Sequence, residues 1–155
     1  MNDFDEGNAA RAESVGAGRK TRKPPTIFYV DDNPRALRML TSVLEGCGYK
    51  VVTAGAAREA LERMEQNTFD LILLAYRLPR MIWFKVAWGL KRRSPGSPVI
   101  LISGHTLWKP EELTHVDAFV GRGATLDSLL NKIRALIGRQ EISSALLQRL
   151  IRKAE

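Results

Sequence analysis

The sequence contains few of the residues that build the common catalytic and metal centres. It has one cysteine, Cys47, and two histidines, His105 and His115, among its 155 residues. A single thiol excludes an internal disulfide and a thiolate metal cage, and neither histidine has a Cys or His partner at the spacing of metal ligands. No Gly-Lys-Ser/Thr loop is present to cradle phosphates, and no Ser/His/Asp arrangement can be placed. These absences predict that the protein is not an enzyme.

Long hydrophobic runs are also missing. The longest apolar stretches, residues 71–75 and 99–102, are far too short to span a bilayer. The first residues, Met1–Gly7, are acidic and polar and lack the basic start and apolar stretch of a secretory signal. Hydrophobic residues make up 45% of the chain, as in ordinary globular domains. We therefore expect a cytoplasmic globular protein without a membrane span.

The charge is unbalanced, with a formal net value of +7. Basic residues cluster at 19–23, at 91–93 and at 149–153. Such charge favours nucleic acid, anionic lipid or an acidic protein partner. No aromatic residues interleave with these clusters, and no zinc-finger or RNA-binding signature accompanies them. A solvated basic surface is the simpler interpretation, and nucleic-acid binding through the basic tail is the weaker one.

Apolar strand patterns alternate with amphipathic helix patterns after a polar start. Residues 1–24 are rich in Gly, Ala, Ser and charge, which predicts a disordered basic N-terminal tail. The main domain is predicted over residues 25–138, with strands at 26–30, 49–53, 69–74, 98–102 and 116–120. Strands that alternate with helices pair in parallel through right-handed crossovers, and strands that are apolar on both faces are covered on both sides. The sequence therefore predicts a doubly wound α/β domain with a five-stranded parallel sheet.

An extra amphipathic helix is predicted over residues 139–155. Its apolar stripe consists of Ile142, Leu146, Leu147, Leu150 and Ile151. Polar and basic residues lie between these positions, as in a helix with one buried face. The helix either packs on its own domain or serves as a docking or dimerisation helix, and in the second case Ile142, Leu146 and Leu150 are contact residues.

In a doubly wound sheet, a site forms beyond the carboxyl ends of the strands, where the strand order reverses. The first strand is followed by Asp31 and Asp32, the fourth by Ser103 and the fifth by Arg122. The third strand runs instead into Ala75. A methyl group can neither attack phosphorus nor bind a hard metal ion, which needs oxygen ligands. This position therefore supplies neither a nucleophile nor a metal ligand.

Four segments resemble, in order and spacing, the receiver domain of two-component response regulators. They are Tyr29–Pro34, Phe69–Ala75, Leu78–Met81 and Val99–Gly104. The resemblance covers residues 26–137 and implies a flavodoxin-like sheet of order 2-1-3-4-5. In this family an acidic pair and an acceptor aspartate hold Mg²⁺, and the acceptor takes the phosphoryl group of a phosphohistidine. A lysine neutralises the incoming charge. A Ser or Thr after the fourth strand turns toward the phosphoryl oxygens, and an aromatic residue of the fifth strand turns with it.

Carried across by this resemblance, the family's roles fall on Asp31, Asp32, Ala75, Arg122, Ser103 and Phe119. The acidic pair, the hydroxyl and the aromatic residue match the family pattern. Ala75, however, lacks the nucleophile and a metal ligand, and Arg122 replaces a compact ammonium with a planar fork. Ile82-Trp83 stands where an acidic or amide residue and a glycine are usual. Because several positions depart together, natural decay of the site is favoured over one engineered substitution, and any Mg²⁺ site at the acidic pair is expected to be weak or lost.

The resemblance implies a degenerate, non-phosphorylatable receiver that acts as a protein-interaction module. A histidine kinase, another regulator or a second copy of the chain is the expected partner. One alternative is a phosphorelay receiver that is modified at Asp31 or Asp32, and another is a basic accessory protein bound to nucleic acid.

Three local predictions accompany this interpretation. Arg122 is predicted to pair with Asp32 and so to substitute for the metal, since an Arg fork binds a carboxylate through two hydrogen bonds. Trp83 and Trp108 are predicted to lie on loops at the mouth of the site as an apolar contact patch, whereas Trp88 is expected to cover the edge of the core. The short segment 105–115 predicts a truncated fourth helix and an altered output face.

Overall fold

The chain forms a five-stranded parallel sheet with helices on both faces. The computed structural model describes residues 23–75, 83–104 and 113–154. The strands are β1 (Thr26–Val30), β2 (Lys50–Ala54), β3 (Leu71–Ala75), β4 (Val99–Ser103) and β5 (Ala118–Gly121), and the helices are α1 (Pro34–Gly46), α2 (Ala57–Gln66), α3 (Trp83–Arg93) and α4 (Leu126–Ala154). The strand order is β2-β1-β3-β4-β5, and every neighbouring pair is parallel. This topology confirms the predicted fold.

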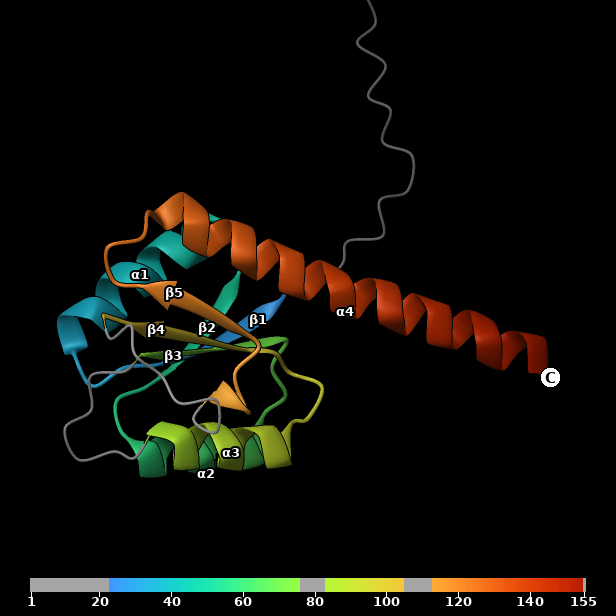
Figure 1. Cartoon of the computed structure of the whole chain (residues 1–155), viewed down its shortest axis with the longest axis horizontal. Helices are drawn as coiled ribbons and strands as arrows, with labels where there is room; N and C mark the ends of the chain where they lie inside the picture. Colours follow the sequence, from blue (N-terminus) through green and yellow to red (C-terminus); the bar gives the residue numbers. More distant parts are fainter. Residues whose placement is uncertain (1–22, 76–82, 105–112, 155) are drawn as a thin grey trace, which may run out of the picture.

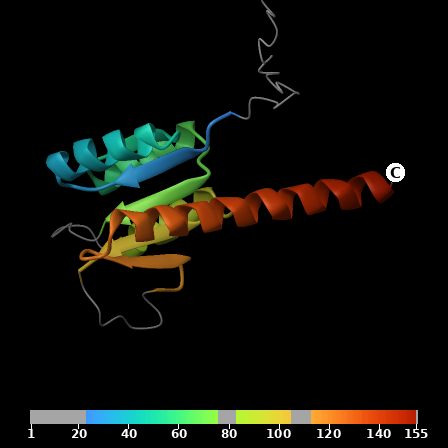
Figure 2. The same ribbon diagram turned by 90° about the horizontal axis from the view of Figure 1, so that it is seen from above.

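The sheet is buried on both faces. Figures 1 and 2 show α1 and α4 on one face and α2 and α3 on the other. Because successive strand residues point to opposite sides, Leu73 packs with the α1 and α4 layer, and Leu74 packs with the α2 and α3 layer. Both side chains are completely buried. The two apolar layers fix the carboxyl ends of the strands, where the site lies.

The loop after β1 is held by the start of α1. The side-chain oxygen of Asn33 accepts hydrogen bonds from the backbone N–H groups of Arg35 and Ala36, at 3.0 and 3.2 Å. Pro34, at the first helical position, needs no hydrogen bond to its nitrogen. After the helix, Gly48 has a φ of +92°, a left-handed conformation that favours glycine. The Asn33 cap therefore determines how the chain leaves β1 beside the site, and Gly48 determines how it turns from α1 into β2.

The start of α2 depends on Glu59, because Ala56 at the cap position offers no side-chain hydrogen bond. The Glu59 carboxylate accepts a hydrogen bond from the N–H of Gly55 at 3.0 Å and pairs with Arg63 at 2.9 Å. The Gly55 hydrogen bond first, and Arg63 second, lower the pKa of Glu59 below its ordinary value of 4.5.

We expect Glu59→Gln to lower the free energy of unfolding by about 0.5 kcal/mol at neutral pH, since the side chain is exposed. A carboxyl group whose pKa is lowered by folding stabilises the protein above its ordinary pKa and loses this effect on acidification. The difference between parent and variant should therefore shrink from pH 7 to below 4.5 in urea titrations. A difference that is constant with pH would contradict this role.

Two helices and four strands differ from the sequence prediction. The segment 139–155, predicted as a separate helix, is the continuation of α4, a single helix of 29 residues. One interior glycine costs a helix only about 1 kcal/mol, so Gly138, flanked by good helix formers, does not end it. Trp83 begins α3 instead of lying in a loop. Strand β1 has the predicted bounds, whereas β2, β3, β4 and β5 are displaced from theirs by one or two residues.

Some predictions concern residues outside the described part of the chain. These residues include the N-terminal tail, Trp108 and nearly all of the predicted fourth helix. Among the described helices, none combines the length and apolar composition needed to cross a membrane.

Candidate functional site

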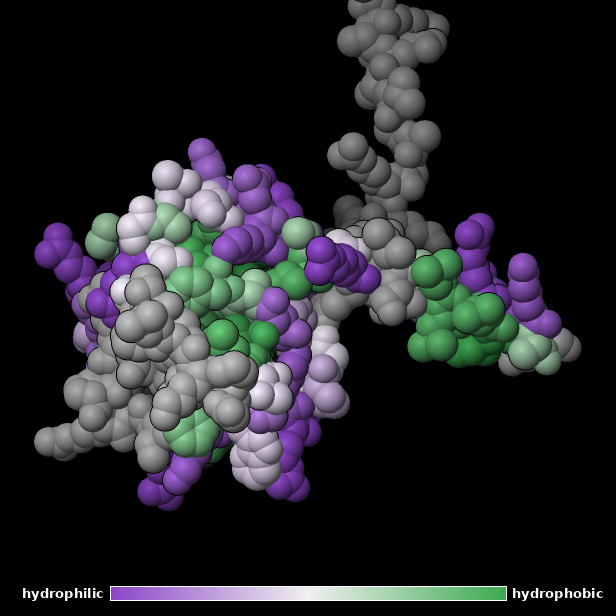
Figure 3. Space-filling view, viewed as in Figure 1, coloured by the Kyte–Doolittle hydropathy of each residue, from purple (hydrophilic) through white to green (hydrophobic). Residues whose placement is uncertain are grey.

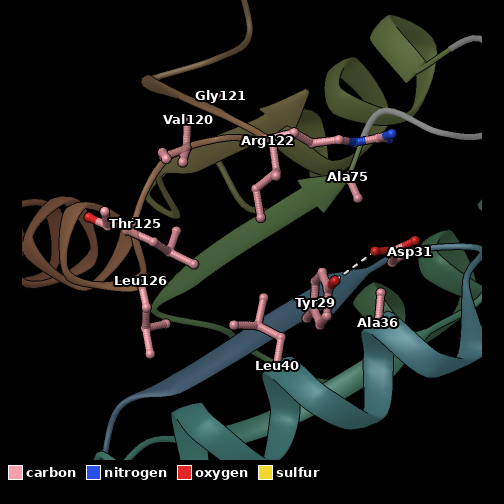
Figure 4. A pocket seen from close by; sticks show the side chains of 13 residues that line it. Tyr29, Asp31, Ala36, Leu40, Ala75, Val120, Gly121, Arg122, Thr125 and Leu126 are labelled. Atoms are coloured by element: carbon pink, nitrogen blue, oxygen red, sulfur yellow. Dashed lines mark hydrogen bonds between the residues drawn. The ribbon is translucent and has the colours of Figure 1, made fainter. Parts of the chain in front are cut away.

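A cavity of about 290 Å³ lies at the carboxyl ends of the strands, between α1 and α4 (Figure 4). It is lined by Tyr29, Asp31, Ala36, Leu40, Ala75, Ile102, Val120, Gly121, Arg122, Ala124, Thr125, Leu126 and Leu129. The adjacent strands β1 and β3 mark the point where the strand order reverses. The cavity therefore occupies the place where doubly wound folds form their sites.

Asp31 is the buried charged residue of this cavity, with 3% of its surface exposed. One carboxylate oxygen accepts a hydrogen bond from the Tyr29 hydroxyl at 2.6 Å, and the other accepts one from the backbone N–H of Asn33 at 2.9 Å. Figure 4 shows the Tyr29 hydroxyl directed at Asp31. Both donors are neutral, and no described residue forms an ion pair with Asp31. Local hydrogen bonds therefore hold this carboxylate in place.

Ala75 ends β3 on the same side of the sheet as Tyr29. It is 3% exposed and belongs to the same buried cluster as the Tyr29 ring. Its methyl group borders the cavity close to Asp31 in Figure 4. At the position where the family that this chain resembles has the acceptor carboxylate, the cavity is therefore bordered by a methyl group.

Arg122 follows β5 and lines the cavity, but it is not paired with Asp32 as predicted. A β-carbon placed on Gly104 would lie 3.6 Å from Cδ of Arg122, so the side chain passes over the end of β4. Figure 4 shows its guanidinium extending toward the end of β3. The ion pairs between described residues lie elsewhere, for example between Lys91 and Asp117 at 2.7 Å. The neighbouring carboxylate of Asp31 is held by Tyr29 and Asn33.

The six predicted site residues do not all meet in one cavity. Asp31, Ala75 and Arg122 line it together. Ser103 is 1% exposed and follows Ile102, a cavity residue, in β4, and consecutive strand residues face opposite sides. Phe119 packs against the apolar cluster of the α2 and α3 face. Asp32 is partly exposed and is not among the lining residues.

Tyr29 was not predicted as a site residue. Its position two residues before Asp31 is a usable signal, because residues i and i+2 of a strand share one face. Tyr29 is almost fully buried and places a hydroxyl group among the buried apolar residues Ile27, Phe28 and Val30 of β1. A buried tyrosine hydroxyl usually finds a hydrogen-bond partner, and here that partner is the first residue of the acidic pair.

The residues of the cavity do not fit the magnesium site of the resembling family. Mg²⁺ requires near-octahedral oxygen coordination. In the part of the chain that the structure describes, no three Asp, Glu, His or Cys side chains converge. Ala75 supplies no oxygen, and both oxygens of Asp31 already accept hydrogen bonds.

The sheet order and the acidic residue at its switch point define a flavodoxin-like domain of the receiver type. The family model for the response regulator receiver domain matches residues 27–119, more than half of the chain. The chain therefore belongs to the response regulator receiver domain family.

Individual relatives agree with this assignment. The transcriptional regulatory protein GlrR of Escherichia coli K12 is 32% identical over 85 residues, which cover 55% of this chain and 19% of GlrR. The probable transcriptional regulatory protein TcrX of Mycobacterium tuberculosis is 26% identical over 129 residues, or 81% of this chain and 55% of TcrX. The chain thus spans about a fifth of one relative and about half of the other.

Solved structures show the same fold. A CheY-like receiver domain protein from Methanospirillum hungatei JF-1 superposes with a TM-score of 0.71 at 27% identity, covering 78% of this chain and 99% of that one. The response regulator TrrA of Thermotoga maritima, solved in complex with Mg²⁺ and BeF, gives a TM-score of 0.67 at 25% identity and covers 72% of this chain and 98% of that one.

Proposed function

We propose that this chain is a receiver domain of a two-component pathway that is not phosphorylated on aspartate and acts as a protein-interaction module. The observation that carries this proposal is Ala75 at the carboxyl end of β3, buried against the cavity. Phosphoryl transfer to a receiver needs a carboxylate oxygen to attack phosphorus, and a methyl group has no lone pair for that step. We also propose that the domain works without Mg²⁺.

Two further features of the cavity support the proposal. Each oxygen of Asp31 accepts a hydrogen bond, one from Tyr29 and the other from Asn33. These bonds make the carboxylate a poorer alternative nucleophile. Arg122 places a planar guanidinium where the family has a lysine, and the two groups differ in how they bind oxygen. Any switching of such a domain must come from a partner that binds two conformations with different affinity.

Exposed aromatic side chains on α3 fit a role in protein interaction. Phe84 is 42% exposed and Trp88 is 47% exposed, one helical turn apart. The prediction that Trp88 covers the core edge is therefore wrong. The guanidinium of Arg92 lies 4.8 Å from the Trp88 ring centroid, and Trp and Arg are enriched at interaction hot spots. The outer face of α3 is thus a candidate surface for a histidine kinase or another regulator.

The proposal is tested by incubating the chain with acetyl phosphate and Mg²⁺ and measuring its intact mass. We expect no gain of a phosphoryl group, because no acceptor oxygen lies at position 75. TrrA, solved with Mg²⁺ and BeF, controls for the reagent, and the variant Ala75→Asp with Arg122→Lys restores the two family residues. A phosphoryl group on the parent chain, mapped to Asp31 or Asp32, would support the alternative of a receiver that is modified at another carboxylate.

A further inference from the structure

Two apolar features of the described chain are not covered by other described residues. One is the far end of α4, where Leu146, Leu147, Leu150 and Ile151 are 54% to 65% exposed and form a contiguous patch (Figure 3). The other is the cavity between α1 and α4 (Figure 4). Of the two, the cavity combines apolar walls with a buried charge, and this combination selects a chemical class of ligand.

The cavity has a buried floor and an open rim. The residues of its floor are each at most 6% exposed: Tyr29, Ala75, Val120 and Leu129. At the rim, Leu126 is 44% exposed, and Thr125 is exposed as well. A volume of about 290 Å³ lies at the lower end of the range of small-molecule sites. The cavity therefore admits a compact molecule from solvent, with roughly one ring or a short chain.

Short side chains create this space. Ala36 on α1, Ala75 at the end of β3 and Ala124 before α4 each contribute a methyl group to the lining. A carboxylate at position 75, as in the family, would occupy part of the cavity and repel Asp31. Alanine at this position instead leaves an apolar space beside a single buried carboxylate.

The buried charge of Asp31 lacks a cation among the described residues. Buried charges in proteins are usually paired or bound to a metal, but the donors to Asp31 are the neutral groups of Tyr29 and Asn33. A carboxylate offers about four acceptor positions, and these two hydrogen bonds leave room for a further donor.

Arg122, the other charged residue of the lining, lies on a different side of the cavity. Its side chain passes over the end of β4 beside Gly104, whereas Asp31 follows β1, and β3 lies between these two strands. Figure 4 likewise shows Ala75 between the guanidinium and Asp31. The β1 side of the cavity is therefore negatively charged.

We propose that the cavity binds a small organic cation, in which an ammonium or amidinium group is attached to a compact apolar body. The cationic group donates a hydrogen bond to Asp31, and the apolar body lies against Leu40, Leu126 and Leu129. A neutral molecule leaves the carboxylate unpaired, and an anion is repelled by it. An inorganic cation gains nothing from apolar walls, and Mg²⁺ needs more oxygen ligands than the cavity supplies.

This inference deepens the proposed function, on which it rests, by naming an input for a receiver that takes no phosphoryl group. Ala36 belongs to α1 and Leu126 begins α4, so a bound ligand contacts both helices. A ligand that binds one arrangement of these helices more tightly than another shifts the population toward it. Ligand binding thereby takes the place of the covalent mark.

Binding is tested by titrating the isotope-labelled full chain with benzylamine hydrochloride, at constant ionic strength and without a phosphodonor. We expect saturable shifts of the backbone amide signals at the cavity, such as those of Gly121 and Leu126. Benzyl alcohol has the same ring without the charge and should bind at least about tenfold more weakly, because charge-assisted hydrogen bonds are the stronger ones. Benzoate, which has the opposite charge, should not shift these signals.

Three variants locate the binding site. Asp31→Asn removes the charge and should lower the association constant for benzylamine at least about tenfold. Asp32→Asn makes the same change at the next residue, outside the lining, and should leave the constant within about twofold. Ala36→Leu fills the cavity without changing any charge and should abolish binding. This variant keeps the proposal testable if Asp31→Asn fails to fold.

Cavity signals that stay unshifted throughout the titration would overturn the proposal, as would equal affinities for benzylamine and benzyl alcohol. Equal losses in Asp31→Asn and Asp32→Asn would overturn it too. Displacement of benzylamine by millimolar Mg²⁺ would assign Asp31 to a metal site, and shifts confined to the far end of α4 would assign the ring to the apolar patch; either result contradicts the proposal. The intact mass after acetyl phosphate treatment is measured separately, so the two proposals fail independently.

Discussion

The Ala75→Asp variant is expected to have a lower free energy of unfolding than the parent chain when a chelator is present. Millimolar Mg²⁺ should restore part of the lost stability. The substitution adds a second carboxylate to a cavity that already holds the buried Asp31. Two like charges at a buried site repel and lack compensation, which costs roughly 2–4 kcal/mol. With Asp31 the new carboxylate forms a pair of oxygen ligands in the cavity, and a divalent cation bound between them relieves the repulsion. Urea titrations with EDTA and with MgCl₂ measure both effects.

Ala75→Asn separates charge from size in this experiment. The asparagine side chain has nearly the same volume as aspartate but no charge, so its destabilisation should be smaller and insensitive to Mg²⁺. The parent chain should likewise show the same stability with and without Mg²⁺. A parent chain that gains as much stability from Mg²⁺ as Ala75→Asp would show that the metal site is intact, and it would contradict the proposed loss.

Removal of the Tyr29 hydroxyl should produce the second large effect. In Tyr29→Phe the ring remains, but the carboxylate of Asp31 loses the 2.6 Å hydrogen bond that it accepts inside the protein. A buried charged group that loses a donor costs about 1–3 kcal/mol. We therefore expect the free energy of unfolding to fall by that amount in chemical denaturation, with no change in the far-UV circular dichroism of the folded protein.

Tyr49→Phe serves as the matched control. Tyr49 is partly buried beside the same apolar cluster, and its hydroxyl makes no hydrogen bond to a described residue. Its loss should change the stability by less than about 0.5 kcal/mol. Equal effects of the two substitutions would mean that the Tyr29 hydroxyl bond does not support Asp31.

The fold was predictable because its signals are local and repeated. Apolar strands such as Leu71–Ala75 alternate with amphipathic helices, and Asn33-Pro34 marks the start of α1. The helix boundary near Gly138 was not predictable from such signals. A glycine that follows an apolar stripe is typical of a helix end, yet here the flanking residues outweigh its modest cost and α4 continues.

The sequence predicted which residues lie at the carboxyl ends of the strands, but it did not predict the contacts of their side chains. The topology brings Asp31, Ala75 and Arg122 to one cavity because they lie at the carboxyl ends of β1, β3 and β5, which share one edge of the sheet. The hydrogen bond between Tyr29 and Asp31, and the path of Arg122 over Gly104, depend on rotamers that the sequence pattern does not encode. The prediction from charge alone, that Arg122 pairs with Asp32, was therefore wrong, and the observed side-chain partner of the acidic pair is Tyr29, which donates to Asp31.

Helix α4 also joins two places that are far apart. Its first residue, Leu126, lines the cavity, and its other end carries Leu150 and Ile151. At 1.5 Å per residue, the 29 residues of this helix form a rod about 43 Å long. A tilt of about 5° at the cavity would displace the far end by about 4 Å. A small repacking around Leu126 would therefore move the C-terminal end of α4 by more than the length of a hydrogen bond.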